Sequence, residues 1–100
     1  MEYNVEEKLA ELDGEKLYWK SFIEQDNLEV GVLKLKPGVK DTQLPHKKDE
    51  IYHILSGNGK ININGDDFEV SSGKVFYVPR ETPHYFHSVS ETITCTYFLN

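Results

Sequence analysis

The first residues of the chain follow the period of an α-helix. Apolar residues recur at helical spacing at Val5, Leu9 and Leu12. Asn4 stands where it can cap the first turn, and Glu7 follows three residues later as a capping-box partner. The pair Asp13-Gly14 then interrupts the pattern. The sequence therefore predicts a short amphipathic helix within residues 1–14.

From residue 17 onward the apolar positions alternate with the period of a β-strand. Turn residues separate segments of this kind at 17–23, 28–32, 51–55, 60–64, 68–70, 75–78, 84–89 and 92–99. Seven to nine short strands, with no room for βαβ crossovers, predict an all-β sandwich or barrel. We expect the N-terminal helix to pack over the mouth of that barrel or against a second subunit.

The length and composition are those of one small globular domain. The chain has 100 residues, of which 38% are hydrophobic and 28% charged, so residues 1–100 are expected to share one core. Cys95 is the only cysteine, which excludes an internal disulfide. Because it lies in an apolar alternating segment, we expect it to fill the core rather than to act as a nucleophile.

The charge distribution argues against nucleic acid and membranes as partners. Eleven basic residues stand against seventeen acidic ones, for a net charge of -6. The one basic pair, Lys47-Lys48, is followed directly by Asp49 and Glu50, whereas phosphate binding needs clustered basic residues. No apolar run could span a bilayer, and the first residues do not have the pattern of a signal peptide. We expect a cytoplasmic protein.

The histidines and one glutamate are the candidate functional residues of this sequence. Strand alternation places Glu50, Tyr52 and Ile54 on one face, with His53 on the other. His84 and Phe86 share a face in the same way, opposite His87, and His46 has the parity of Glu50. Two histidines and one glutamate can therefore converge inside a barrel. Imidazole and carboxylate together are ligands for first-row divalent metals.

Two spaced motifs contain these residues. The first is Gly38, five residues, Leu44-Pro45-His46, three residues, Glu50, six residues and Gly57. The second is Gly73, five residues, Pro79-Arg80-Glu81, two residues, His84, three residues and Ser88. Both spacings resemble the two motifs of the cupins, and the resemblance extends over about residues 28–99. It implies an all-β fold, the double-stranded β-helix or jelly-roll cupin barrel, with the short helix at its N-terminus.

The resemblance also implies the ligand set. His46, Glu50 and His84 match three of the four metal ligands of the family, while Leu44 replaces the first histidine. Gln43 has an amide oxygen that could ligate weakly, although its strand parity is wrong unless Pro45 makes the backbone irregular. Glu81 and Ser88 replace a glycine and an asparagine that are not ligands, so these changes concern loop conformation.

The implied function is that of a metal-dependent enzyme acting on a small molecule. Three ligands of this kind suit Fe(II) and leave room for a chelating substrate and dioxygen, so a dioxygenase-like oxidation is expected. Mn, Ni, Zn and Cu are alternatives, as is a lyase or isomerase step. Another alternative is a non-catalytic cupin, either one that binds a small ligand as a sensor or storage module, or a degenerate one with hydrogen bonds around water. Burying Glu50 between two histidines without a cation would be costly, which favours a bound metal.

For the remaining histidines, Arg80 and the aromatic residues we expect structural positions in the core, on the surface or in an interface. His53 and His87 are predicted to lie on the sheet surface or in a subunit interface, and Arg80 to be a solvated loop charge. Tyr52 is either core or a hydrogen-bond donor, just beyond the ligands, to bound substrate. Aromatic residues occur on both faces of an early strand, at Tyr18, Trp19 and Phe22. Because one of those faces needs cover, a homodimer is expected.

Overall fold

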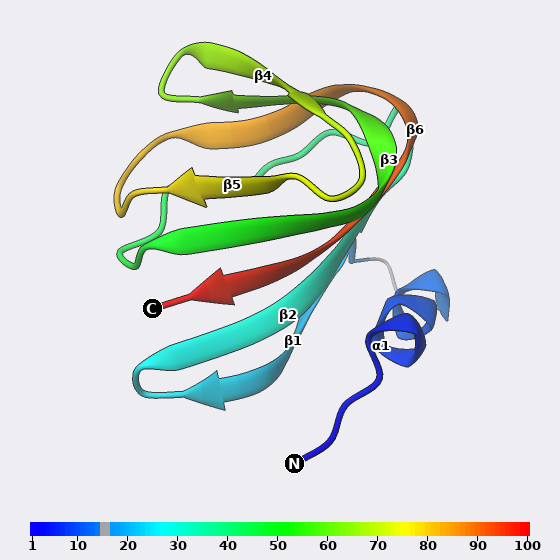
Figure 1. Ribbon diagram of the computed structural model, residues 1–100, viewed down its shortest axis with the longest axis vertical. Coiled ribbons are helices and arrows are strands. Elements are labelled where there is room, and N and C mark those ends of the chain that lie inside the picture. Colours follow the sequence, from blue (N-terminus) through cyan, green and yellow to red (C-terminus); the bar gives the residue numbers. More distant parts are fainter. Residues whose placement is uncertain (15–16) are drawn as a thin grey trace.

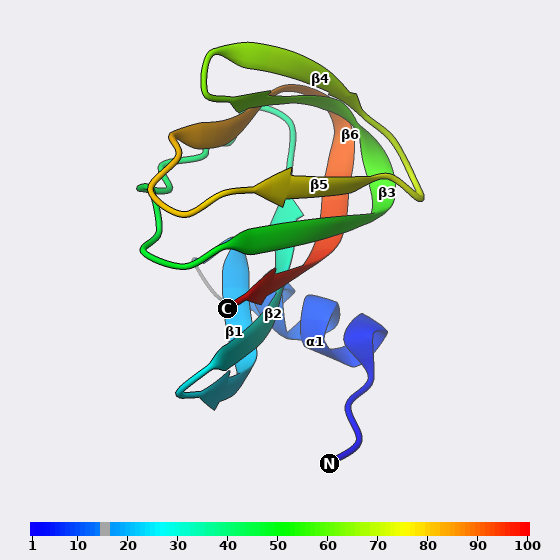
Figure 2. The same cartoon turned by 60° about the vertical axis from the view of Figure 1, so that its left-hand side comes forward.

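A curled antiparallel sheet follows a short helical segment at the N-terminus. This computed structural model describes residues 1–14 and 17–100. The elements in these residues are α1 (Val5–Glu11), the 3₁₀ helix η1 (Leu12–Gly14), β1 (Trp19–Gln25), β2 (Leu28–Leu35), β3 (Glu50–Ile63), β4 (Asp66–Val70), β5 (Val75–Val78) and β6 (His84–Leu99). The strand order is β1-β2-β6-β3-β4, and β5 pairs with β3. Figures 1 and 2 show the strands curling around one interior, which confirms the predicted double-stranded β-helix.

Two strands are longer than the pattern predicts. The segments 51–55 and 60–64 belong to the single strand β3, and 84–89 and 92–99 belong to β6. Between Ile54 and Lys60 the register of β3 against β6 shifts repeatedly. Gly57 has a φ of 104° there, and a Cβ at this position would overlap the Thr92 carbonyl oxygen. The glycine thus lets β3 bend without ending, and the described residues form six strands rather than seven to nine.

The alternation along β3 and β6 places the core as predicted. Tyr52 and Ile54 are fully buried, whereas Ile51 and His53 are exposed. The same cluster contains Leu33, Leu35, Ile61, Phe86, Ile93 and Cys95. Cys95 is confirmed as a core residue, and burial raises the pKa of its thiol well above the usual range.

The N-terminal helix forms as predicted and lies beside β2 rather than over the barrel mouth. The Asn4 side chain caps α1 by accepting the Glu7 backbone N–H at 2.9 Å. Ion pairs tie the helical segment to the outer side of the first hairpin, Glu11 to Lys20 at 3.2 Å and Asp13 to Lys34 at 2.8 Å. The predicted position over the barrel mouth is therefore wrong, because the helical segment lies beside β2 on its outward face (Figure 1).

Burial on both faces of β2 explains this position. Val30 and Val32 point away from the main core and are nevertheless buried, as is Leu12 of η1. The ring of Tyr3 lies 5.2 Å from that of Phe22. The N-terminal segment thus covers part of the surface for which a partner subunit was expected, and the homodimer stays a prediction. No helix of the described residues is long and apolar enough to cross a membrane.

Candidate metal centre

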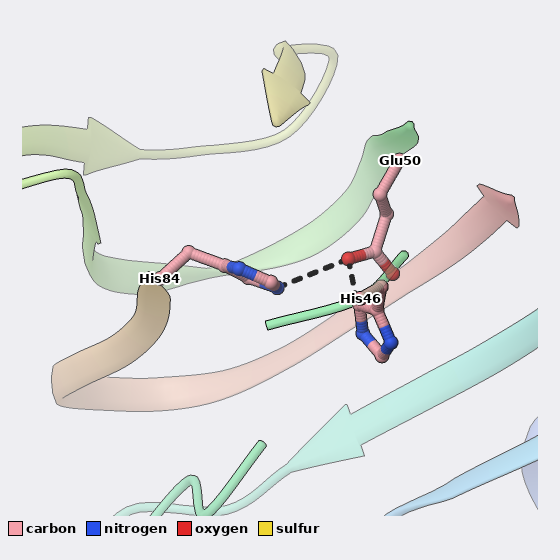
Figure 3. A group of neighbouring side chains, drawn as sticks. All are labelled: His46, Glu50 and His84. Atoms are coloured by element: carbon pink, nitrogen blue, oxygen red, sulfur yellow. Dashed lines mark ion pairs between the residues drawn. The ribbon is translucent and has the colours of Figure 1, made fainter. Parts of the chain in front are cut away.

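Three different parts of the chain supply the predicted ligands. His46 lies in the connection 36–49 between β2 and β3, Glu50 is the first residue of β3, and His84 is the first of β6. β5 places Val78 opposite Glu50, and the loop 79–83 leads from there to His84. The three side chains consequently converge although the outermost two lie 38 positions apart in the sequence (Figure 3).

The donor atoms of these side chains face one another inside the protein. Nε2 of His84 lies 3.0 Å from Oε1 of Glu50, and Nε2 of His46 lies 3.4 Å from the same oxygen. The side chains of Glu50 and His84 are 2% and 1% exposed. None of these three buried atoms has a hydrogen-bond partner. Since buried polar atoms without partners are costly, the arrangement calls for a proton or a cation between them.

The spacing suits a cation. Ligand atoms about 2.1 Å from a metal and at right angles to each other lie about 3 Å apart, close to the two distances given above. Two imidazoles and one carboxylate suit first-row divalent ions, and the donor set alone does not select among them. The residues present therefore fit a divalent metal.

The backbone fixes the orientation of the His84 ring. Nδ1 of His84 lies 2.8 Å from the Thr82 carbonyl oxygen, and a carbonyl can only accept. Nδ1 must therefore carry a proton, which leaves the lone pair of neutral Nε2 aimed at the centre, as in many histidine ligands of metals. Burial works against protonation of this ring, but contact with Glu50 and Thr82 outweighs it and raises the pKa of His84.

A cavity of about 460 Å³ opens onto His46 and Glu50. Its wall includes Tyr18, Trp19 and Tyr97, with Glu29 among the polar groups. A larger groove of about 660 Å³ lies across the connection 36–49 and contacts His84 but neither His46 nor Glu50. The smaller cavity therefore meets two of the three candidate ligands, and the larger groove meets one.

Of the two residues before Pro45, Gln43 points inward and Leu44 is exposed, the reverse of what strand alternation predicts. Leu44, at the position of the missing histidine, is 78% exposed. Gln43 turns inward instead, where its Oε1 accepts a 3.0 Å hydrogen bond from the Tyr52 hydroxyl. The strand parity fails here because the connection 36–49 is not a strand. Gln43 as a weak ligand stays a prediction, with its amide oxygen already bonded to Tyr52.

Tyr52 is confirmed as a core residue, and its role as a hydrogen-bond donor to bound substrate stays a prediction. The residue is fully buried in the core cluster, and its ring centroid lies 6.0 Å from that of His84. Burial raises the pKa of its hydroxyl well above the usual range. The Tyr52 hydroxyl therefore keeps its proton and holds Gln43 beside the centre.

Asp41 organises the connection 36–49, and the sequence did not point to it. This buried carboxylate accepts hydrogen bonds from the Tyr18 hydroxyl at 2.8 Å, from the Phe86 backbone N–H at 2.9 Å, and from both the backbone and side-chain N–H groups of Gln43. Asp41 thus fastens the segment with His46 to β6. No periodic pattern distinguishes the segment Asp41-Thr42-Gln43. Its only visible feature in the sequence is a run of polar residues between Gly38 and Pro45.

The two motif loops are also fastened to each other. The Glu81 N–H donates to the His46 carbonyl oxygen at 2.6 Å, and Glu81 has a φ of 60°, the left-handed conformation that favours glycine. Arg80 is exposed, as expected, and its backbone and guanidinium both bond Asp49. The backbone at residue 81 therefore needs the left-handed conformation that a glycine would adopt easily, and Glu81 adopts it with strain.

The other two histidines lie outside the centre, as predicted. His53 is exposed on the outer face of β3. His87 is partly exposed, and its Nε2 lies 2.8 Å from an oxygen of Asp67. Within residues 1–14 and 17–100, the three residues His46, Glu50 and His84 form the one group of histidine, cysteine and acidic side chains that could hold a metal ion.

Comparison with known proteins agrees with this architecture. Residues 31–99 match the family described as "Cupin domain". The uncharacterized protein SCO3923 of Streptomyces coelicolor is 34% identical over 90 residues, which are 86% of this chain and 86% of that protein.

Two solved structures show the same fold at lower identity. The DMSP lyase DddQ from Ruegeria pomeroyi has a TM-score of 0.75 at 19% identity, over 82% of this chain and 45% of DddQ. The cupin domain of Cnp3 from Schizosaccharomyces pombe has a TM-score of 0.73 at 19% identity, over 81% of this chain and 61% of that one. At these identities the likeness concerns the fold.

Proposed function

The chain belongs to the cupin family, and from that premise we propose that it is a metal-dependent enzyme acting on a small organic molecule. The observation that supports this most is the group of three buried donor atoms on His46, Glu50 and His84, which face one another without hydrogen-bond partners. The neighbouring cavity of about 460 Å³ has the size of a small-molecule site.

The metal we favour is Fe(II), with Mn, Ni, Zn and Cu as alternatives. Two imidazoles and one carboxylate around such an ion leave positions for an oxygen-donor substrate and for dioxygen, the requirement of a dioxygenase-like oxidation. A lyase or isomerase step needs the same open positions, with the cation polarising a carbonyl group. The three ligands and the cavity support this whole class of reactions, and we propose the oxidation first.

The side chains around the centre would position the reactants. Thr82 holds the His84 ring in the tautomer that points Nε2 inward. The chain from Tyr52 through Gln43 to Asp41 keeps the connection 36–49 in place beside the cavity. Leu33 and Leu99 supply apolar wall that limits the water around the reacting groups.

One observation favours a non-catalytic, ligand-binding cupin as the second candidate. Leu44 is exposed, so it contributes nothing to the ligand set in place of the family's first histidine. A cupin that has lost one of the family's ligands can still bind a small molecule in its cavity without turning it over. The experiment must therefore separate turnover from binding.

The decisive experiment measures metal and turnover together. Protein purified without added metal is analysed for its elements and then reloaded with Fe(II), Mn(II), Ni(II) or Zn(II). Each form is screened with diketones, hydroxy acids, thiols and phenols while oxygen uptake, products and melting temperature are recorded. We expect one metal per chain and oxygen consumption by the Fe(II) form. Compounds that raise the melting temperature but are recovered unchanged from every form would establish the binding function instead.

A further inference from the structure

A second carboxylate faces the cavity at some distance from the metal ligands. In the sheet, Glu29 of β2 lies opposite Leu99 of β6, and Leu99 lies opposite Glu50 of β3. The three residues thus form one row across three strands, and Glu29 and Glu50 both line the cavity. Two strand spacings separate their backbones by about 10 Å, the span of a small organic molecule with a polar group at each end.

A chain of hydroxyl groups fixes the polarity at Glu29. The Ser21 hydroxyl donates to Oε2 of Glu29 at 2.6 Å, and the Tyr97 hydroxyl lies 2.7 Å from the same serine oxygen. A hydroxyl group has one proton to give, so Ser21 gives it to Glu29 and must accept from Tyr97. Burial raises the pKa of Tyr97 well above its usual range, so its hydroxyl keeps that proton. The chain ends at a carboxylate that can only accept from a ligand.

The surroundings of Glu29 favour a positive ligand group. The residues that line the cavity include no lysine or arginine. In the part of the chain that the structure describes, no ion pair involves Glu29. Trp19 and Tyr18 add aromatic surface to the same cavity, and aromatic faces attract cations.

We propose that Glu29, with Ser21 and Tyr97 behind it, binds a primary ammonium group of the substrate, while a carboxylate at the other end of the substrate would bind the metal that His46, Glu50 and His84 would hold. This makes the substrate a small zwitterion of the amino-acid type. Binding of the ammonium group by Glu29 needs no metal, whereas the position of the carboxylate rests on the proposed function.

The test uses matched probes on the Zn(II)-loaded protein. 4-Aminobutyrate, 4-hydroxybutyrate and butyrate differ in one terminal group, and Trp19, the single tryptophan, lines the cavity and reports binding by its fluorescence. We expect 4-aminobutyrate to bind roughly tenfold more tightly than butyrate, since hydrogen bonds to charged groups are the strong ones. Equal affinities of 4-aminobutyrate and 4-hydroxybutyrate would overturn the assignment of an ammonium group.

Two variants locate the effect. Glu29→Gln should remove the preference for 4-aminobutyrate and leave Zn(II) affinity within about twofold, because Gln keeps the size of the side chain but not its charge. Glu24→Gln is the matched control, since Glu24 lies opposite Glu29 in the β1–β2 pair but is exposed and does not line the cavity. Equal losses in the two variants would mean a general charge effect and would contradict the proposal.

A metal-free arm separates this inference from the proposed function. n-Butylamine has only the ammonium end, so the metal-free protein should bind it more weakly but still in a manner that depends on Glu29. If the wild-type protein retains no metal, the proposed function fails while the n-butylamine titration still decides the subsite. If n-butylamine and 4-aminobutyrate bind the wild type and Glu29→Gln equally, the subsite fails whatever the metal result.

Discussion

His84 and His87 lie three residues apart on β6 and place the same ring atom near a carboxylate. Nε2 of His84 lies 3.0 Å from Glu50, and Nε2 of His87 lies 2.8 Å from Asp67. Their surroundings differ, because the His84 side chain is 1% exposed and that of His87 is 29% exposed. His87 and Asp67 make hydrogen bonds, whereas Nε2 of His84 has no hydrogen-bond partner.

The contrast shows which features distinguish a candidate metal centre from a surface ion pair. The residue types and distances are nearly the same at both places. What differs is burial, a backbone carbonyl that fixes the His84 tautomer, and a second histidine, His46, aimed at the same oxygen. Water can complete the hydrogen bonds of the exposed pair, while the buried group needs a cation or a proton.

The largest expected effect is the loss of metal from His84→Ala. Two remaining ligands hold a divalent ion poorly, so we expect the affinity to fall at least about 100-fold. His87→Ala is the matched control and should change affinity less than about twofold, because Asp67 alone offers no site. Competition titration with a zinc chelator measures both variants. Equal losses would mean that the buried cluster is not the metal site.

Metal addition should stabilise the protein through the same cluster. At a free metal concentration 100 times the Kd, the folded state gains about 2.7 kcal/mol, which raises Tm by roughly 10–20 °C for a domain of this size. A chelator should reverse the shift. We expect His87→Ala to retain the shift and His84→Ala to lose it, as measured by circular dichroism. A shift that survives in His84→Ala would place the metal elsewhere.

The exposed pair should contribute to acid stability rather than to metal binding. Hydrogen bonds from His87 and then Asn62 lower the pKa of Asp67. Because the folded-state pKa is depressed, the contribution is present above the unfolded-state value and disappears as pH falls through the folded-state value. In Asp67→Asn, the urea midpoint should fall slightly at pH 7 and depend less on pH below about 4. An unchanged acid profile would show that the pair contributes nothing measurable.

The smallest expected effect concerns a new histidine at position 44. Leu44 is 78% exposed, so a histidine at this position should be solvated, as His87 partly is, and Leu44→His should leave metal affinity within about threefold. Isothermal titration with Zn(II) measures this. Markedly tighter binding of Zn(II) would mean that the connection 36–49 can rearrange and bring residue 44 to the metal. It would then contradict the distinction between exposed histidines, which do not bind the metal, and the buried cluster, which does.

Strand periodicity was sufficient to predict the ligands on regular strands. Glu50 and Tyr52 share the buried face of β3, and His84 and Phe86 share that of β6, because alternate side chains in a strand must face the same side. His46 could be assigned by its motif spacing, although it lies outside any strand. The core residues of β3 and β6 and the three candidate ligands were therefore predictable.

The features that depend on distant contacts were not predictable from local patterns. β2 has apolar residues at Val30 and Val32, so alternation alone favours that face as the interior, yet the helical segment covers it while Glu29 lines the cavity. Asp41 bonds residues far along the chain, including Phe86. Bends such as the one at Gly57 look like strand ends in the sequence, because a glycine between two alternating segments is typical of both.

The hydrogen bonds of Asp41 also have a consequence for local opening of this region, which we expect to occur without global unfolding. The backbone N–H of Phe86 is held by the Asp41 carboxylate and that of Thr42 by the Tyr18 hydroxyl, which itself bonds Asp41. Amide protons whose hydrogen bonds share one side chain become able to exchange together when the segment that carries this side chain opens locally. In native-state hydrogen exchange these two amides should therefore form one cooperative unit, with an opening free energy below that of the central strands.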